Sequence, residues 1–346
     1  MRQVVRWSAL ACALAAVACG SSSPAAPSSS AASSSTTSTS GKFQTNGRLI
    51  DALSSAAVSG VTATSTDTRQ IFATATDTNG AFTLGVDTAG TTSLPFSFGG
   101  ASIVTRQTFI KVPGDAVTVT AIPRTFDLAA FDEMCRTPML MRWTVAPPLV
   151  VATQTLQFTG LNDSTFTAIN ETMSDAEATS LITDMSWALP QMTGGQFAVF
   201  TGTQRAPAAT GQAVAMMVTG QITVARFAGL SAATGGNVGY SRWQYQQDGR
   251  VVAGLIMLDR DFDKSSATHV RAVRAHELGH SLGYNHVTLA LRPSVMNPIA
   301  LLEPNAFDLA ATKLAFMRPT GNKTPDIDPS GFSTNSLRLT WTAPIR

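Results

Sequence analysis

The residues best suited to chemistry lie between His276 and His286, where the sequence reads His-Glu-Leu-Gly-His-Ser-Leu-Gly-Tyr-Asn-His. His276 and His280 stand four residues apart, so on a helix both imidazoles project from one face. Glu277 lies beside the first histidine and can reach a water molecule held near both rings. Gly283 can end the helix in the left-handed conformation, so that the reversed chain returns His286. Three protein ligands with one open position are typical of a catalytic zinc site.

The alternative for this stretch is a helix with incidental histidines. The chain holds four histidines, and three of them fall within eleven residues at ligand spacing. The fourth, His269, lies seven residues before His276, which is about 10 Å along a helix axis and too far to share one zinc ion. We therefore predict one zinc ion on His276, His280 and His286, and we expect His269 behind these ligands or at the surface.

This stretch resembles the extended motif of the metzincin zinc peptidases, which is matched by His276, Glu277, His280, Gly283 and His286. The resemblance implies that Met296, in Ser-Val-Met-Asn-Pro, supplies the methionine turn beneath the zinc site. Some metzincins place a tyrosine ligand two residues after this methionine. Here that position is Pro298, so the chain looks more like the matrixins.

The resemblance extends over residues 141–320 and implies an α+β fold: a mixed twisted sheet, a long helix, the active-site helix, the methionine turn and a C-terminal helix. Ser174 and Glu177 form a capping box that predicts the long helix over 174–189, ended by Pro190. The apolar runs predict the remaining elements, namely strands at 147–151, 197–200, 222–225 and 251–258 and a helix at 306–317.

The run 251–258 is the strand candidate nearest the predicted active-site helix. In metzincins the strand in this place is an edge strand beside the cleft, and extended peptides add to it through main-chain hydrogen bonds. The nearly continuous apolar character of 251–258 also favours burial on both faces. The resemblance therefore implies an edge strand, the apolar pattern favours a plain core strand, and both can hold at once.

Asp259, Asp261 and Asp263 follow this strand at alternate positions. Carboxylate oxygens are the ligands that Ca²⁺ prefers, so a calcium loop is one interpretation of the triplet. The spacing lacks the glycine and the closing glutamate of an EF-hand, which favours a solvated turn. Ser265 or Ser266 is then expected to cap the following helix.

Residues 43–124 read as short β-rich runs with turn signals, such as Asn79-Gly80 between strand-like flanks at 76–78 and 81–84. This pattern predicts a small all-β sandwich that precedes the catalytic domain. Gly47, Gly60 and the Thr-Asp-Thr-Asn-Gly-Ala-Phe run resemble the carboxypeptidase-regulatory-like, transthyretin-like domains, whose role is usually structural or adhesive.

A predicted linker at 125–140 contains Cys135. A lone thiol ahead of a zinc domain is compatible with a cysteine switch, in which the thiolate occupies the open zinc position. The residues around Cys135 do not match that motif in the matrix metalloproteases, so we predict a buried, inert cysteine.

The N-terminus carries export signals. Residues 1–18 combine two arginines with an apolar run, which is typical of a signal peptide and too short to span a bilayer as a helix. Cys19 and Gly20 then resemble a bacterial lipoprotein signal in which Cys19 is lipidated, although Ala16 stands where leucine is usual. Residues 19–42 are rich in Ser, Thr, Ala and Pro and predict a flexible tether. We expect a cell-envelope lipoprotein or a secreted protein that contacts the membrane only through its anchor.

The formal net charge of +2, without a basic block, argues against a nucleic-acid partner. The sequence therefore predicts a zinc-dependent endopeptidase that acts on protein or peptide substrates. Zinc would activate a water molecule and Glu277 would serve as general base. The tail at 321–346 contains one strand-like run at 337–341. Cleavage specificity and oligomeric state do not follow from the sequence.

Two other functions fit the same residues. The first is a surface-anchored binding or adhesion protein with a weak or inactive zinc domain, in which the sandwich does the binding. The intact Glu277 argues against it, because a decayed enzyme has little need of that carboxylate. The second is a zinc hydrolase of a non-peptide amide, which the motif by itself does not distinguish from a peptidase.

Overall fold

The computed structural model describes residues 41–67, 71–88, 93–288, 290–299, 302–330 and 337–341. Across these residues the chain is a mixed α and β protein with several sheets and five α-helices. They belong to one compact unit, Thr39–Arg346. None of the described helices is both long enough and apolar enough to cross a membrane. The predicted signal peptide, Cys19 and the tether up to residue 40 lie outside the described residues.

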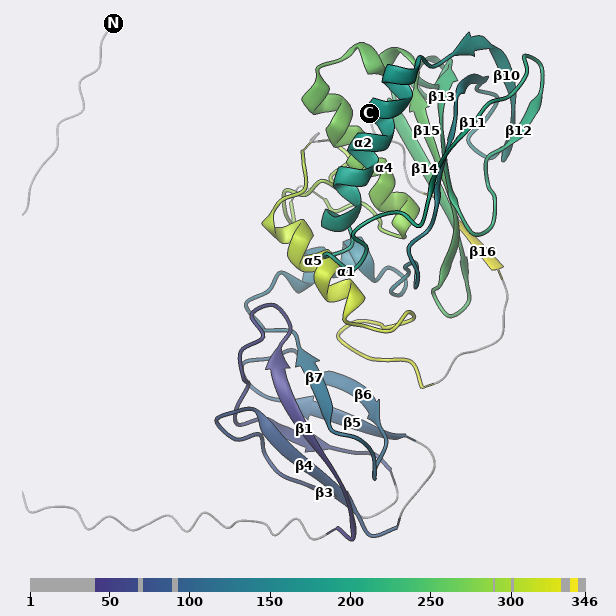
Figure 1. The fold of residues 1–346 in the computed structure, drawn as a ribbon. Helices are drawn as coiled ribbons and strands as arrows, with labels where there is room; N and C mark the ends of the chain where they lie inside the picture. Colours follow the sequence, from purple (N-terminus) through teal and green to yellow (C-terminus); the bar gives the residue numbers. More distant parts are fainter. Residues whose placement is uncertain are drawn as a thin grey trace, which may run out of the picture. The chain divides into compact units, whose positions relative to one another are not determined.

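Two small sheets form the first part of this unit (Figure 1). One has the order β3-β4-β1-β7, from β3 (Ile71–Ala73), β4 (Ala81–Val86), β1 (Phe43–Asp51) and β7 (Val117–Ala121). The other has the order β2-β5-β6, from β2 (Thr62–Thr64), β5 (Leu94–Gly99) and β6 (Arg106–Ile110). Alternate residues point into a shared core, where the rings of Phe82 and Phe98 lie 5.1 Å apart.

One flank of the predicted Asn79-Gly80 turn differs from expectation. Residues 76–78 form no strand, because the Asp77 carboxylate accepts hydrogen bonds from the N–H groups of Asn79 and Ala81 and folds the chain into a loop. Gly80 has a φ of +75°, as the turn requires.

The second part is built on a nine-stranded sheet with the order β12-β10-β9-β13-β15-β14-β16, in which β8 also pairs with β13, and β11 with β8. Its parallel centre comprises β11 (Thr203–Ala206), β8 (Leu149–Ala152), β13 (Ile222–Ala228) and β15 (Val251–Asp259). The remaining strands are β9 (Gln154–Gln157), β10 (Thr165–Thr172), β12 (Ala213–Ala215), β14 (Gly239–Gln246) and β16 (Leu337–Trp341).

The prediction that 251–258 is an edge strand was wrong. The strand β15 is an interior strand between β13 and β14, and eight of its nine residues are buried. Its apolar run therefore reflects burial on both faces. The strand that lies farther out is β14, which pairs antiparallel with β15 on one side and with β16 on the other. Its Arg and Gln residues hide its strand character in the sequence.

Two helices cover one face of this sheet, and they lie side by side in Figure 1. The first, α2 (Asp175–Gln191), begins with the predicted capping box of Ser174 and Glu177. Pro190 lies inside its last turn and does not end it, since a proline there removes only one helical hydrogen bond. The second, α4 (Ala267–Leu282), begins at Ser266, whose hydroxyl accepts from the N–H of His269.

Three shorter helices complete the described part: α1 (Leu128–Cys135), α3 (Leu230–Thr234) and α5 (Ala306–Phe316). The predicted strand at 197–200 is absent. Its first residue, Phe197, is held in a turn by the hydroxyl of Thr193, and its ring packs edge-on against Phe316 of α5.

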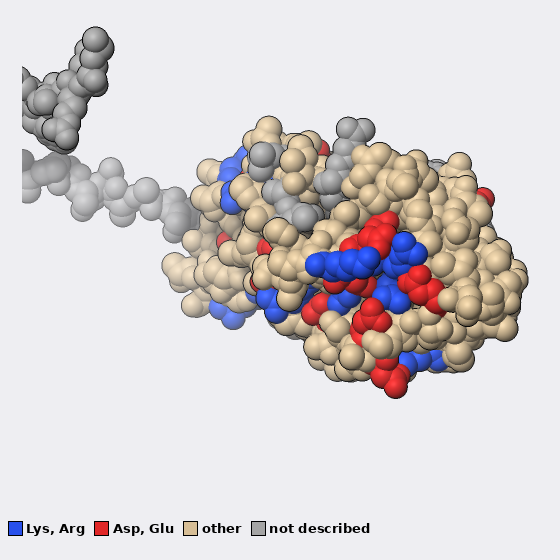
Figure 2. Space-filling view, turned by 90° about the horizontal axis from the view of Figure 1, so that it is seen from above, with Lys and Arg blue, Asp and Glu red and all other residues tan. Residues whose placement is uncertain are grey.

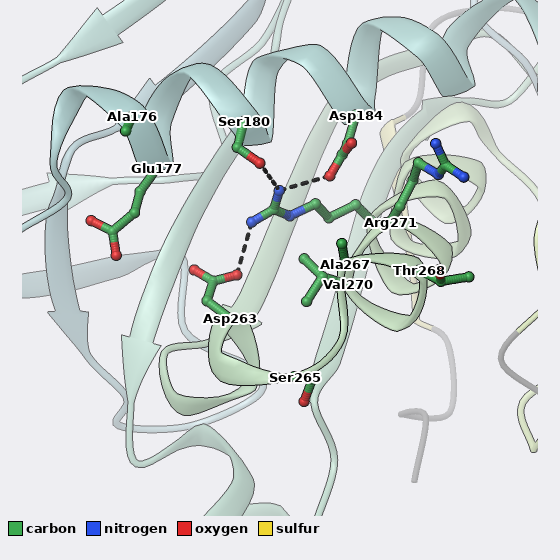
Figure 3. Close-up of a pocket in the computed structure, with 11 residues that line it drawn as sticks. Ala176, Glu177, Ser180, Asp184, Asp263, Ser265, Ala267, Thr268, Val270 and Arg271 are labelled. Carbon is green, nitrogen blue, oxygen red and sulfur yellow. Dashed lines mark hydrogen bonds and ion pairs between the residues drawn. The ribbon is translucent and has the colours of Figure 1, made fainter.

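A buried arginine in the middle of α4 ties this helix to α2 and to the residues just before α4. Arg274 donates to the hydroxyl of Ser180 and to the carboxylates of Asp184 and Asp263, the last two at 2.8 Å (Figure 3). Asp263 belongs to η1 (Asp261–Lys264), the short helix ahead of α4. Seen from above in Figure 2, basic and acidic side chains lie intermixed in one patch. The hydrogen bonds of Arg274 fix the helix that carries the histidines relative to α2.

Candidate metal centre and active site

Helix α4 delivers three of the predicted site residues and ends where the sequence predicts. His276, Glu277 and His280 lie in its last two turns and are buried. Gly283 caps the helix with a φ of +111°, and a Cβ at this position would lie 2.7 Å from the carbonyl oxygen of Met141. Glycine is therefore required both by the backbone conformation and by space. The chain then reverses and brings His286 back to the helix.

The three imidazoles converge through their Nε2 atoms. The Nε2 of His286 lies 3.2 Å from that of His276 and 3.0 Å from that of His280. Nitrogen ligands placed 2.0–2.1 Å from a tetrahedral zinc ion are about 3.3 Å apart, so the spacing fits that ion. Among the described residues, this is the one group of three or more His, Cys, Asp or Glu side chains that could hold a metal.

The opposite ring nitrogens are fixed by backbone carbonyls. The Nδ1 of His276 lies 2.6 Å from the oxygen of Val295, and the Nδ1 of His280 lies 2.7 Å from the oxygen of Tyr284. A carbonyl can only accept, so each Nδ1 carries the proton and each Nε2 keeps its lone pair. The rings are thus oriented as metal ligands before any ion binds.

Electrostatics keep these rings neutral. Burial lowers the pKa of His276 to about 3, with His286 contributing, and it lowers the pKa of His286 to about 4. Burial also lowers the pKa of His280 well below its ordinary value. Neutral imidazole is the form that binds a metal, so proton competition is weak at neutral pH.

Glu277 is completely buried between α4 and β14. The hydroxyl of Ser241 donates to its Oε2 at 2.6 Å, whereas its Oε1 has no hydrogen-bond partner. Burial raises the pKa of Glu277 to about 8, and the Ser241 hydrogen bond acts in the opposite direction. A buried carboxylate oxygen without a hydrogen-bond partner is available to accept a proton.

Residues of strand β14 (Gly239–Gln246) also limit the space around the Glu277 carboxylate. A Cβ at Gly239 would lie 2.4 Å from Oε1 of Glu277. Farther along the strand, the Trp243 ring stacks on His280, with centroids 6.1 Å apart and planes within 4°. Gly239, Ser241 and Trp243 were missed by sequence reasoning, because β14 itself was not predicted.

Met296 packs against Gly279 of the helix that carries His276 and His280. It is completely buried, and a Cβ at Gly279 would lie 2.4 Å from its sulfur. The loop that carries Met296 is anchored to α5 by Asp308, whose carboxylate accepts from the hydroxyl of Ser294 and, at 3.0 Å, from the N–H of Val295. Asp308 is a buried acid that sequence reasoning missed, although its place in a second capping box with Asn305 was readable.

The three aspartates proposed as a calcium loop do not converge. The carboxylate of Asp259 accepts from the N–H groups of Ser231 and Asp261. Asp261 pairs with Arg260 and Lys264, and Asp263 pairs with Arg274. Each carboxylate thus has its own partner, and the geometry lends no support to a shared calcium ion.

The remaining predicted residues lie away from the histidines. His269 is exposed at the start of α4, and Pro298 is half-buried after the methionine turn. Cys135 is completely buried at the end of α1, where burial raises the pKa of its thiol well above the ordinary value. A thiol in such surroundings stays protonated and unreactive, as expected of a structural cysteine.

A comparison of the chain with the models of known protein families finds no match, and a search of curated proteins finds no relative.

Proposed function

We propose that this protein is a zinc-dependent endopeptidase of the metzincin type. The observation that carries the proposal is the convergence of three Nε2 atoms, two of them on rings oriented by backbone carbonyls, next to a buried glutamate. A purely structural zinc site would be closed by a fourth protein ligand, and among the described residues only three side chains converge.

The three histidines and Glu277 would have different roles in the reaction. His276, His280 and His286 would hold the ion, with Val295 and Tyr284 fixing two of the rings through their carbonyls. When bound, zinc would polarise the scissile carbonyl and lower the pKa of a water molecule toward ~7.

Glu277 accepts the proton of the attacking water at its unpartnered Oε1 and returns it to the leaving amine. Ser241 holds the other carboxylate oxygen in place during this transfer.

Several features of the fold support a metzincin-type domain. These are a long helix packed on a mixed sheet, a second helix with the histidines, a glycine-terminated reversal, a buried turn methionine and a last helix that braces this turn. With Pro298 two residues after Met296, the site resembles that of the matrixins.

The N-terminal residues bear on where the protein is located. We propose export through residues 1–18 and either lipidation at Cys19 or secretion, with the two-sheet module acting as a carboxypeptidase-regulatory-like spacer. A Cys19→Ser variant of the full chain should lose incorporation of a labelled fatty acid and move from the membrane fraction to the soluble fraction. Unchanged fractionation would contradict lipidation without affecting the catalytic proposal.

The catalytic proposal is tested with an unstructured protein substrate, a zinc chelator and the Glu277→Gln variant. The wild type should cleave the substrate, chelation should abolish cleavage, and Glu277→Gln should lose activity by about 10³-fold or more while binding one zinc ion. His269→Ala is the matched control and should change neither zinc content nor rate. Bound zinc without cleavage of any protein or peptide would refute the peptidase and leave the binding protein or the non-peptide amidase.

A further inference from the structure

Strand β14 contacts Glu277, the proposed general base. Along one face of β14, Gly239 and Ser241 contact Glu277, and Trp243 stacks on His280. The inner edge of the strand is taken by β15. Its outer edge therefore offers the N–H and C=O groups that an extended peptide entering the site would pair with.

In this structure a segment of the same chain occupies that edge. Strand β16 pairs antiparallel with β14, from Leu337 opposite Gln246 to Trp341 opposite Arg242 (Figure 1). Main-chain pairing does not depend on side-chain identity, so β16 and an extended substrate would require the same backbone groups of β14. Both cannot pair with these five residues at once.

The chain leading to β16 is held firmly on its N-terminal side. Arg318 forms a bidentate ion pair with Asp326, at 2.7 and 2.8 Å, and both side chains are completely buried. Arg106 of β6 forms a second bidentate pair with Asp328, at 2.8 and 2.5 Å. The backbone of Gln107 also exchanges hydrogen bonds with Asp326 and Asp328.

This anchor limits how far β16 can move when it leaves β14. Leu337 lies nine residues after Asp328, a step that spans at most about 30 Å when fully extended. A short tether of this kind gives an effective concentration in the millimolar range. A weak strand interaction is then sufficient to keep the edge occupied, yet a substrate can still displace it.

We propose that β16 is a self-docking strand that competes with substrate for the outer edge of β14 and so restrains the enzyme. This inference rests on the proposed peptidase function for its consequence, although the docking itself does not. A simpler role would be protection of an exposed edge against aggregation. The two roles differ, because only a competing strand raises the KM for a peptide substrate.

The test replaces two successive residues of β16 in the full chain, Arg338→Pro together with Leu339→Pro. Successive N–H groups of a strand point to opposite sides, so one of any two faces β14 and is removed by proline. Arg338→Ala together with Leu339→Ala is the matched control, because it keeps both N–H groups. A chain ending at Ser330 provides a second variant should the proline pair disturb folding.

The first readout is independent of catalysis. Amide hydrogen exchange on metal-free protein should show faster exchange at alternate residues of Arg242–Gln246 in the proline variant, and wild-type protection in the alanine control. A fluorescent peptide of residues 335–343 should bind the proline variant and the shortened chain, and should bind the wild type at least tenfold more weakly.

The second readout is cleavage of a quenched fluorescent peptide by the zinc-loaded protein. If β16 is docked in about nine molecules of ten, the proline pair should lower KM about tenfold with little change in kcat. The alanine pair should stay within twofold of the wild type.

Unchanged exchange at β14 in both the proline variant and the shortened chain would overturn the proposal. So would faster exchange accompanied by an unchanged KM, which would leave edge protection alone. Faster exchange and binding of the labelled peptide, but no cleavage by any variant, would confirm the docking strand and refute the peptidase instead.

Discussion

Gly239 offers the sharpest test of how the site is built. This residue begins β14 and has no unusual backbone angle, so alanine fits its local conformation. The added Cβ would nevertheless lie 2.4 Å from Oε1, 2.8 Å from Cγ and 2.9 Å from Cδ of Glu277. Gly239→Ala therefore acts on the proposed general base and leaves the metal ligands untouched.

The size of the effect follows from these distances. Ordinary contact begins near 3.4 Å, so Oε1 has to move by about 1 Å. Glu277 is completely buried and its Oε2 is held by Ser241, so the whole carboxyl group has to shift. A displacement of about 1 Å in a catalytic group can cost about 10²-fold in rate. Overpacking at one methyl group should cost only about 1–3 kcal/mol of stability.

The assay compares kcat for a peptide substrate, zinc content and the midpoint of urea unfolding. Gly239→Ala should lose about 100-fold in kcat, keep one zinc ion and remain folded. Gly202→Ala is the control, because a Cβ there meets nothing within 4 Å and its backbone conformation is ordinary. It should match the wild type in all three measurements.

Retention of kcat within threefold by Gly239→Ala, with zinc content and fold intact, would refute the assignment of Glu277 as the base in the position described. Loss of zinc together with activity would show that the strand shapes the metal site and not the carboxylate alone.

Three further predictions concern the same architecture. Ser241→Ala should lower kcat about 10–100-fold at unchanged KM, since a hydrogen bond to a charged group contributes about 1.5–3 kcal/mol, and Ser241→Thr should restore most of it. Metal-free protein should be most stable a little above pH 6.5. Below this pH the unfolded chain binds more protons than the folded chain, because its histidines titrate near the ordinary value of 6.5 whereas burial lowers the pKa of the three folded histidines. Above it the folded chain still holds the proton of Glu277, whose pKa is about 8, whereas the unfolded chain has already released it near pH 4.5, so stability should fall until about pH 8, and Glu277→Gln should abolish this decline in a urea titration. Arg318→Ala should cost about 3 kcal/mol or more in urea unfolding, because Asp326 is left buried without its bidentate partner, and wild-type stability would contradict this.

Local sequence pattern predicts the presence of a strand but not its place in the sheet. The apolar run at 251–258 identified a strand but not its neighbours, because β14 and then β16 lie outside it in the sheet. Pairing partners of a strand are set by contacts between distant segments, which no local pattern contains. The polar residues of β14 point to the same difficulty, since Arg242 is buried against the carbonyl oxygens of Leu161 and Asp163 and reads in isolation as a surface residue.

Local sequence pattern also does not predict the partners of charged residues. Asp259, Asp261 and Asp263 have a spacing compatible with a metal loop, yet arginine, lysine and backbone N–H groups occupy their oxygens. The partners of these aspartates include residues of other elements, such as Arg274 on α4. The sequence does not show these contacts, so it could not exclude a bound ion.

The sequence by itself determined the site from His276 to His286, because one helical turn and one glycine reversal suffice to bring three imidazoles together, and both depend on neighbouring residues. The tertiary structure decided everything that reaches this site from elsewhere. It brought Ser241 and Gly239 of β14 against Glu277, placed the carbonyl of Val295 on His276, and laid β16 along the edge of β14. These contacts join residues 19 to 99 positions apart, and only the packing of the whole sheet and its helices specifies them.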